Sequence, residues 1–198
     1  EPVMSKNGLE ALYVCGPRKC GKSHLIGQIL SHSNHPVLLF SDADNDQTLD
    51  NFVGKRLLRI DCEGLVDDPM PISDFNGHIA VFDDCDSFEN EEVVHVVHDL
   101  NNRLLKSGRH KCDLKGIIRS SHCMFEGGKS KHNLLHASGV VFFPRGGGKS
   151  NAKRFLDVHM NMDRKNSDKI MNLKDRWVLI YRDCPNCVLT SKKLIMLD

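Results

Sequence analysis

One eight-residue motif constrains the fold of this chain more than any other feature. Gly16 to Ser23 reads GPRKCGKS and matches the pattern G-x-x-x-x-G-K-[ST] at every fixed position. An apolar segment, 11–15, precedes the motif with the composition of a strand, and residues 23–31 after it can form a helix. Strand, glycine-rich loop and helix in that order favour a phosphate-binding loop, in which backbone N–H groups and a helix N-terminus surround an anion. The sequence therefore predicts a nucleotide-binding α/β domain.

The residue types in the motif have separate expected roles. Lys22 would reach the β- and γ-phosphates of ATP, and Ser23 would place its hydroxyl on Mg²⁺. Gly16 and Gly21 allow backbone angles that a Cβ atom would penalise. The alternative interpretation is a chance glycine turn. The residues expected to bind the nucleotide are Gly16, Pro17, Arg18, Lys19, Cys20, Gly21, Lys22, Ser23 and His24.

A second motif supplies the carboxylates that a nucleotide site needs. Residues 78–84 read HIAVFDD, four apolar residues that run into two aspartates, which is a Walker B pattern. A buried parallel strand would deliver these aspartates to the same sheet edge as the phosphate loop. Asp83 is expected to hold Mg²⁺ through water, and Asp84 to polarise the attacking water as the catalytic base. The alternative for Asp84 is a helix N-cap or a simple surface acid.

The remaining pattern predicts further strands and helices of an α/β fold. Apolar runs at 36–40, 57–60, 116–122 and 139–143 have strand length, and residues 90–106 have helical spacing up to Gly108, which should end the helix. The strand at 116–122 ends in polar residues, so His122, or Ser121, could sense the γ-phosphate. The alternatives there are a helix-cap serine and a surface histidine.

The C-terminal third is expected to form helices and a strand pair. Residues 152–174 predict one or two helices, broken near Asn166 and Ser167. The runs at 177–181 and 193–197 predict a terminal β-hairpin. The expected organisation is a lead-in at 1–8 and a single P-loop ATPase domain at 9–198, in which 176–198 is the terminal strand pair.

Composition places few limits on partners. The chain of 198 residues has 27 Lys and Arg against 26 Asp and Glu, a net charge of +1, which neither argues for nor excludes nucleic acid. The second half is richer in basic residues, so a basic face is one expectation and an ordinary solvated surface the other. No secretory signal or membrane span is predicted, and the eight scattered cysteines indicate free thiols in a reducing compartment.

Two glycine- and lysine-rich stretches predict flexible basic loops. Both contain a GKS string but lack the earlier glycine of a phosphate loop. Their cations, Lys129, Lys131, Arg145 and Lys149, could follow a DNA backbone, with a solvated loop as the equal alternative. Cys184 and Cys187 form half of a zinc motif without a second half, so a turn with two thiols is favoured over a metal site.

The order of motifs resembles that of one protein family. GPRKCGKS, HIAVFDD, Ser107-Gly108-Arg109-His110, IIRSSH, VVFFP and a strand pair from Trp177 follow one another along most of the chain. This order resembles the viral genome-packaging ATPases of the FtsK–HerA superfamily, of the poxvirus, giant-virus and virophage type. The resemblance implies a RecA-like P-loop NTPase fold, with a mostly parallel central sheet flanked by helices.

The same resemblance implies a function and partners. It implies an ATP- and Mg²⁺-dependent motor, a ring of five or six subunits that drives double-stranded DNA into a preformed capsid, located in the host-cell cytoplasm, the virus factory or the virion. Arg109 is the first candidate for an arginine finger that acts on a neighbouring subunit, and Arg145 is the second. This chain has Asp84 where many members have Glu, and His122 where Gln is frequent, so the roles of these two residues depart from the family pattern.

Two other functions fit part of the sequence. A small P-loop kinase that phosphorylates a nucleotide or a small metabolite fits the chain length, and Asp42-Ala43-Asp44 could bind its acceptor hydroxyl. Against it, no arginine-rich lid is apparent and the paired aspartates favour hydrolysis. A non-catalytic nucleotide switch is disfavoured by the intact set of Lys22, Ser23 and Asp84.

Overall fold

The chain divides into two compact units. The computed structural model describes residues 10–43, 47–125, 133–145, 149–182 and 187–197. The first unit comprises Glu1–Ala11 and Gly21–Ser121, and the second comprises Leu12–Cys20 and His122–Asp198. The phosphate-loop motif crosses from the second unit into the first between Cys20 and Gly21, so its two halves are also described separately.

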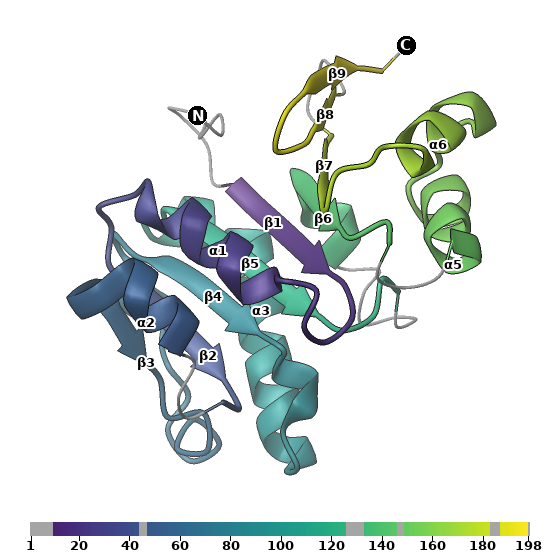
Figure 1. Cartoon of the computed structure of the whole chain (residues 1–198). Helices are drawn as coiled ribbons and strands as arrows, with labels where there is room; N and C mark the ends of the chain where they lie inside the picture. The colour runs from purple at the N-terminus through teal and green to yellow at the C-terminus, as the bar shows by residue number, and fades with distance from the viewer. Residues whose placement is uncertain (1–9, 44–46, 126–132, 146–148, 183–186, 198) are drawn as a thin grey trace. The chain divides into compact units, whose positions relative to one another are not determined.

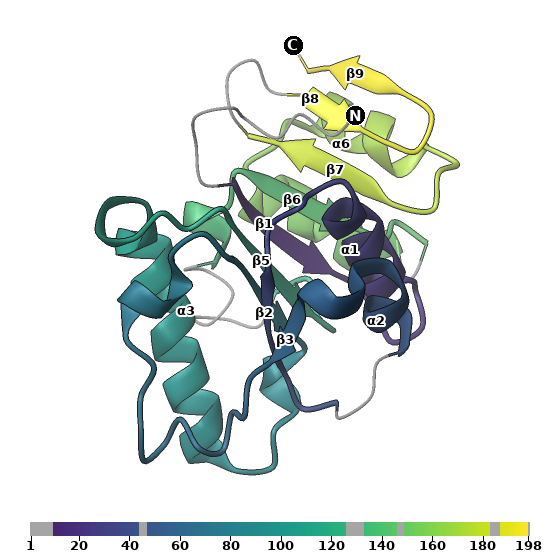
Figure 2. The ribbon, with the colours of Figure 1, turned by 90° about the vertical axis from the view of Figure 1, so that its left-hand side faces the viewer.

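The first unit holds four parallel strands in the order β3-β2-β4-β5. Figures 1 and 2 show α1 and α2 on one face of these strands and α3 on the other. Its elements are α1 (Lys22–Ser31), β2 (Val37–Ser41), α2 (Gln47–Val53), β3 (Leu57–Arg59), β4 (Ile79–Asp83), α3 (Glu91–Lys111) and β5 (Gly116–Ser121), with short 3₁₀ turns at Gly54–Arg56, Ile72–Phe75 and Cys85–Ser87.

Aromatic stacking organises the core under α3. The Phe40 ring stacks on Phe82 with centroids 4.7 Å apart and on Phe75 with centroids 5.9 Å apart. Leu100 and Leu104 of α3 are buried in the same cluster. Because Phe40 and Phe82 are partners in the parallel register of β2 and β4, the alternation of each strand places both rings on one face.

The second unit combines parallel and antiparallel pairing. Strand β1 (Glu10–Cys15), most of which belongs to this unit, pairs in parallel with β6, and β7, β8 and β9 continue antiparallel from β6. Its other elements are β6 (Gly139–Phe142), α5 (Lys149–Arg154), a π-helical segment (Phe155–His159), α6 (Arg164–Met171), β7 (Val178–Tyr181), β8 (Cys187–Leu189) and β9 (Leu194–Met196). A separate core gathers Tyr13, Phe142 and Phe155.

The fold class predicted from the sequence is confirmed. The sheet strands are mostly parallel, helices flank them, and the C-terminal strands form antiparallel hairpins. The hairpin differs from the prediction in one detail, because β8 lies between the two predicted strands and pairs with both. The predicted single domain at 9–198 stays a prediction.

The prediction that Gly108 ends the third helix is wrong. Helix α3 continues to Lys111 and has 21 residues. A Cβ atom on Gly108 would lie 2.8 Å from Cδ2 of Leu114, so the glycine serves the close approach of that leucine. Glycine within a helix costs stability, and here the packing of a neighbouring side chain accounts for it.

The predicted helix break near Asn166 and Ser167 is also misplaced. Both residues are buried within α6, and the break lies at 160–163. Asp163 starts the new helix, because its Oδ1 accepts a hydrogen bond of 2.9 Å from the Asn166 backbone N–H. Aspartate is a preferred N-cap because its carboxylate accepts a hydrogen bond from a backbone N–H of the first turn that has no partner within the helix.

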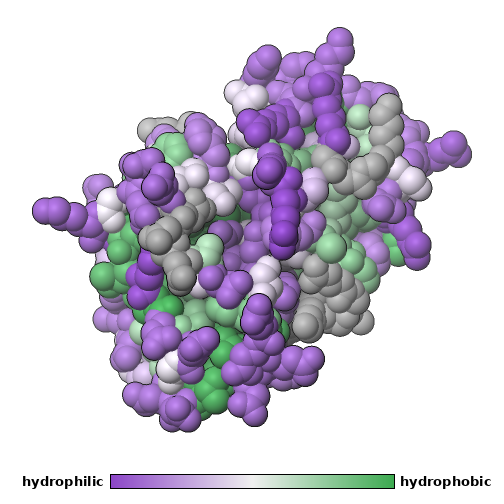
Figure 3. Space-filling view, turned by 60° about the horizontal axis from the view of Figure 1, so that its bottom comes forward, coloured by the Kyte–Doolittle hydropathy of each residue, from purple (hydrophilic) through white to green (hydrophobic). Residues whose placement is uncertain are grey.

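The surface drawn in Figure 3 and the thiols of the described cysteines have the following properties. Hydrophilic side chains predominate on the face drawn in Figure 3, and hydrophobic ones gather in a few places. The described cysteines are free thiols. Burial raises the pKa of the Cys62 thiol to about 11 and that of Cys85 well above its ordinary value, so these thiols are unreactive. No helix among the described residues combines the length and apolarity that a bilayer span requires.

Candidate nucleotide site

The first half of the motif forms a tight loop in the second unit. The Cys20 N–H donates to the Pro17 carbonyl at 3.3 Å, and Lys19 has a φ of 63°. A Cβ atom on Gly16 would lie 2.7 Å from Cδ2 of Phe143 and 2.9 Å from Sγ of Cys20, so the close approach of these side chains requires glycine. Arg18 and Lys19 are exposed.

The second half of the motif opens helix α1 in the first unit. Gly21 has a φ of 107°, which an L-residue rarely adopts, and its carbonyl accepts from the Leu25 N–H at 3.1 Å. The first turn of α1 contains no acidic residue that would neutralise the positive end of the helix dipole. His24 is exposed and contacts the Phe52 ring edge-on, with centroids 5.1 Å apart.

The first unit brings the lysine of the motif to the paired aspartates. Lys22 Nζ lies 3.3 Å from Oδ2 of Asp84. The Lys22 side chain is only 6% exposed and that of Asp84 is 24% exposed, and Asp83 is buried. Sixty-one residues separate Lys22 from Asp83, so only the parallel packing of the strands could bring them to one sheet edge.

Ser120 joins the two aspartates and was missed in the sequence. Its Oγ lies 2.5 Å from Oδ1 of Asp83 and 3.0 Å from Oδ1 of Asp84, and it accepts from the Asp84 N–H at 3.0 Å. The sequence prediction chose Ser121 and His122 at the end of this strand. Strand alternation is the signal that could have identified Ser120, because neighbouring residues of β5 point to opposite faces.

Asp84 has an unusual backbone conformation. Its φ of 47° and ψ of 37° place a non-glycine residue in the left-handed region, immediately before the 3₁₀ turn Cys85–Ser87. Such conformations cost energy and persist where surrounding contacts fix them, most often at functional sites. The Ser120 hydroxyl supplies one of these contacts.

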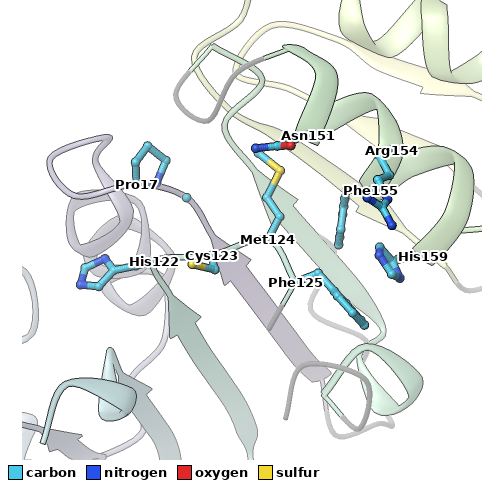
Figure 4. Close-up of a pocket in the computed structure, with 10 residues that line it drawn as sticks. Pro17, His122, Cys123, Met124, Phe125, Asn151, Arg154, Phe155 and His159 are labelled. Carbon is cyan, nitrogen blue, oxygen red and sulfur yellow. The ribbon is translucent and has the colours of Figure 1, made fainter. Parts of the chain in front are cut away.

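His122 lies in the second unit, where it lines a pocket of about 490 Å³ together with the first residues of the phosphate loop (Figure 4). The Phe125 and His159 rings stack in this pocket with centroids 3.6 Å apart. The residues that line it are Gly16, Pro17, His122, Cys123, Met124, Phe125, Asn151, Arg154, Phe155 and His159. The structure therefore places the predicted sensor histidine beside the loop.

Arg176 also contacts the loop and was missed in the sequence. Its Nε donates to the Cys20 carbonyl at 2.9 Å, so the segment before β7 holds the loop backbone. No motif marks this arginine, because 156 residues separate it from Cys20.

The remaining predicted site residues fall partly outside the described residues. Arg109 lies in the last turn of α3, and its side chain is outside them, as is that of Lys149. Lys129, Lys131 and Cys184 are outside them altogether, whereas Arg145 is described and exposed. Among the described residues, no three His, Cys, Asp or Glu side chains form a group that could hold a metal ion.

The strand order and the loop geometry define the class: the fold is that of a P-loop NTPase. The described part also resembles solved viral packaging NTPases. It matches genome-packaging NTPase B204 of Sulfolobus turreted icosahedral virus 2 in complex with sulfate, with a TM-score of 0.59, 14% identity and 96% of each chain covered. It matches B204 of Sulfolobus turreted icosahedral virus, a DNA-packaging ATPase, with a TM-score of 0.58, 13% identity and coverage of 97% and 98%. These likenesses establish the fold, in agreement with the resemblance seen in the motifs.

Two further comparisons extend this result. The conjugation coupling protein TcpA of pCW3, solved with ATPγS, matches with a TM-score of 0.51 and 10% identity over 96% of this chain and 61% of that chain. The uncharacterized protein V3 of Sputnik virophage is 28% identical over 185 residues, 89% of this chain and 72% of V3. No family model matches the sequence.

Proposed function

We propose that this chain is an ATP-hydrolysing motor that translocates double-stranded DNA into a viral capsid. The observation that carries the proposal is the 3.3 Å contact between Lys22 Nζ and Asp84 Oδ2, with Ser120 within hydrogen-bonding distance of both Asp83 and Asp84. A phosphate-loop lysine together with Walker B carboxylates is a recurring arrangement of P-loop NTPases.

Each residue of this group has a proposed role. Lys22 binds the β- and γ-phosphates, and the N-terminus of α1 with the loop N–H groups surrounds them. Asp84 orients the attacking water and accepts its proton, because its carboxylate is partly exposed whereas that of Asp83 is buried. His122 senses the γ-phosphate, which is supported by its place beside Gly16 and Pro17.

The donor set fits Mg²⁺. The Ser23 hydroxyl and the Asp83 carboxylate are hard oxygen ligands, and Mg²⁺ in nucleotide sites uses one or two such ligands with water and substrate phosphates. A bound Mg²⁺ would supply neutralisation of charge on the phosphate oxygens.

The named relatives support ATP as the nucleotide. B204 of Sulfolobus turreted icosahedral virus 2 is solved with AMPPCP and with ATPγS, at TM-scores of 0.55 and 0.56 to this chain. These proteins are named for genome packaging, and the V3 relative belongs to a virophage. We therefore assign ATP, and a location with the virus in the host-cell cytoplasm, the virus factory or the virion, to this chain.

The distribution of charge supports DNA as the partner. The second unit has 16 Lys and Arg against 7 Asp and Glu, which gives +9, and the first unit has 11 against 19, which gives −8. The overall +1 hides this division. A polyanion would bind the second unit and be repelled by the first, as phosphate contacts dominate nonspecific DNA binding. Exposed cations on α6 include Arg164, Lys165 and Lys169.

The assembly remains part of the proposal. We infer that the two units form one ATPase domain and that five or six copies form a ring that engages the capsid. Arg109, in the last turn of α3, is the first candidate to reach the nucleotide of a neighbouring subunit, and Arg145 is the second. An arginine finger contributes about 10³ to 10⁵ in rate.

Turnover of ATP with linear duplex DNA tests the proposal. We expect purified protein to release phosphate from ATP and to do so faster when duplex is added, whereas Lys22→Ala is inactive with or without DNA. Phosphate release that requires a small acceptor molecule and ignores DNA would identify a kinase instead. Absence of turnover in the intact protein under all these conditions would overturn the proposed function.

A further inference from the structure

A partly buried network of three side chains adjoins the paired aspartates. Asp86, two residues after Asp84, faces Arg119 of β5 and His98 of α3. Arg119 Nη2 lies 3.3 Å from both carboxylate oxygens of Asp86, and His98 Nε2 lies 2.5 Å from Oδ1. Arg119 Nη2 also lies 2.9 Å from His98 Nε2. All three residues belong to the first unit.

Burial makes this network unlike a surface ion pair. The Arg119 side chain is 4% exposed, His98 12% and Asp86 22%. A buried cation requires a partner with good geometry, because water is not available to replace it. Asp86 is the carboxylate that Arg119 contacts from within a strand whose other residues are buried.

Two consecutive residues of β5 hold the turn that carries Asp84. Ser120 bonds Asp83 and Asp84, and Arg119 bonds Asp86. Strand alternation directs the two side chains to opposite faces, so the turn is fixed at two points. Between these points Asp84 has a φ of 47°, a conformation that needs such support.

The hydrogen bonds of His98 require a side chain that can donate to Asp86 or accept from Arg119. One nitrogen, Nε2, contacts both a donor, Arg119, and an acceptor, Asp86. If Nε2 carries the hydrogen, it donates to Asp86; if it does not, it accepts from Arg119. Either state keeps a hydrogen bond, and an apolar side chain keeps neither.

We propose that Arg119, Asp86 and His98 are positioning residues that hold the Asp84 carboxylate in its reactive place and connect the catalytic turn to α3. This inference rests on the proposed ATP hydrolysis. Helix α3 carries His98 in its second turn and Arg109 in its last, so the same rigid element adjoins both the catalytic turn and the candidate finger. Asp86, His98 and Arg119 all lie outside the phosphate-loop motif at 16–23, so we expect the network to affect turnover rather than nucleotide binding.

The test compares two histidines on one helix. His98→Leu should lower kcat for ATP by about tenfold and leave KM and the nucleotide Kd within twofold, because small displacements of a catalytic group cost rate more than affinity. His98→Gln should recover most of the rate, since its amide can donate to Asp86 or accept from Arg119. His95→Leu is the matched control, because His95 is exposed on α3.

A second pair of variants guards against loss of folding. Asp86→Asn removes the carboxylate from Arg119 and should lower kcat similarly, whereas Asp50→Asn, in an exposed Asp–Arg pair with Arg59, should leave kcat unchanged. If Asp86→Asn does not fold, His98→Leu and its Gln rescue decide the question. All assays are run below the unfolding transition of each variant.

The outcomes separate the two hypotheses. If the intact protein does not hydrolyse ATP, the proposed function fails. If it does, and His98→Leu keeps kcat within twofold while only its Tm falls, the network is structural and this inference fails alone. A kcat loss shared by His95→Leu would also overturn it.

Discussion

The two units of this chain differ in charge, in strand direction and in the kind of contact that holds each together. The strands described in the first unit are parallel, and this unit has an aromatic core, an excess of acid and Lys22 beside the paired aspartates. The second turns to antiparallel pairing after β6, borders its core with methionines and has an excess of base. Under the proposed function, the acidic first unit would hold the paired aspartates of hydrolysis, and the basic second unit would supply most of the contact with DNA.

Core truncation gives the largest expected effect on this comparison. Phe82→Ala in the first unit and Phe155→Ala in the second should each destabilise by about 3–5 kcal/mol, because each removes a fully buried ring. If the units fold as one domain, both variants lower a single calorimetric transition. Two separate transitions, each sensitive to one variant only, would contradict a single domain.

Exposed residues provide the controls for these variants. Leu58→Ala and Val158→Ala truncate side chains that are 48% and 62% exposed, one in each unit. Both should change the free energy of unfolding by less than about 0.5 kcal/mol.

Loss of the loop lysine comes next in magnitude. Lys22→Ala should lower kcat at least about 100-fold, which corresponds to about 2.7 kcal/mol, because a buried cation beside the phosphates stabilises developing charge. Steady-state phosphate release measures it. Lys55→Ala, an exposed lysine of the same unit, serves as the control, and equal rates for the two variants would contradict the assignment.

The charge division predicts an intermediate effect on DNA binding. The triple change of Arg164, Lys165 and Lys169 to Ala on α6 should weaken duplex binding about tenfold, and the salt slope should fall by about 0.9 for each phosphate contact removed. Basal turnover without DNA should not change. Fluorescence anisotropy at several salt concentrations measures both quantities.

A matched triple change tests whether position matters or only total charge. Lys55, Lys106 and Lys111 are exposed cations of the first unit, and their replacement by Ala removes the same charge. Equal weakening by both triple variants would show that binding follows net charge alone and would remove the distinction between the units.

The smallest effect is expected at the cap of α6. Hydrogen bonds from the Asn166 backbone and side chain lower the pKa of Asp163. A lowered folded-state pKa stabilises the protein above the ordinary aspartate range, and the stabilisation is lost as the pH falls through the lowered pKa. Asp163→Ala should therefore lower Tm slightly at neutral pH and not at strongly acid pH. A difference in Tm that is the same at both pH values would contradict this.

The sequence predicted the elements of the site better than their mutual contacts. The strand and loop motifs were sufficient to place Lys22 and Asp84 at one sheet edge, because parallel strands order their ends. Ser120 escaped prediction because the strand-end argument favoured the last polar residues, Ser121 and His122, although strand alternation could have identified it. Arg119 carries a signal of its own in the sequence, because a cation within a buried apolar strand must have a partner.

Contacts between distant residues and the exact ends of helices could not be predicted from the sequence pattern. Arg176 reaches Cys20 through folding alone, and no local sequence rule relates them. Gly108 was expected to stop a helix, but its lack of a Cβ serves packing against Leu114. The missing Cβ of a glycine can either allow the backbone turn that ends a helix or make room for a neighbouring side chain. Only the three-dimensional structure distinguishes these two cases.

Ser120 has a single hydroxyl hydrogen, yet two aspartates lie within its reach. At any instant it can donate to only one of them, so the hydroxyl couples the hydrogen bonding of one carboxylate to that of the other. A ligand that draws the Ser120 hydrogen toward one aspartate therefore withdraws it from its neighbour.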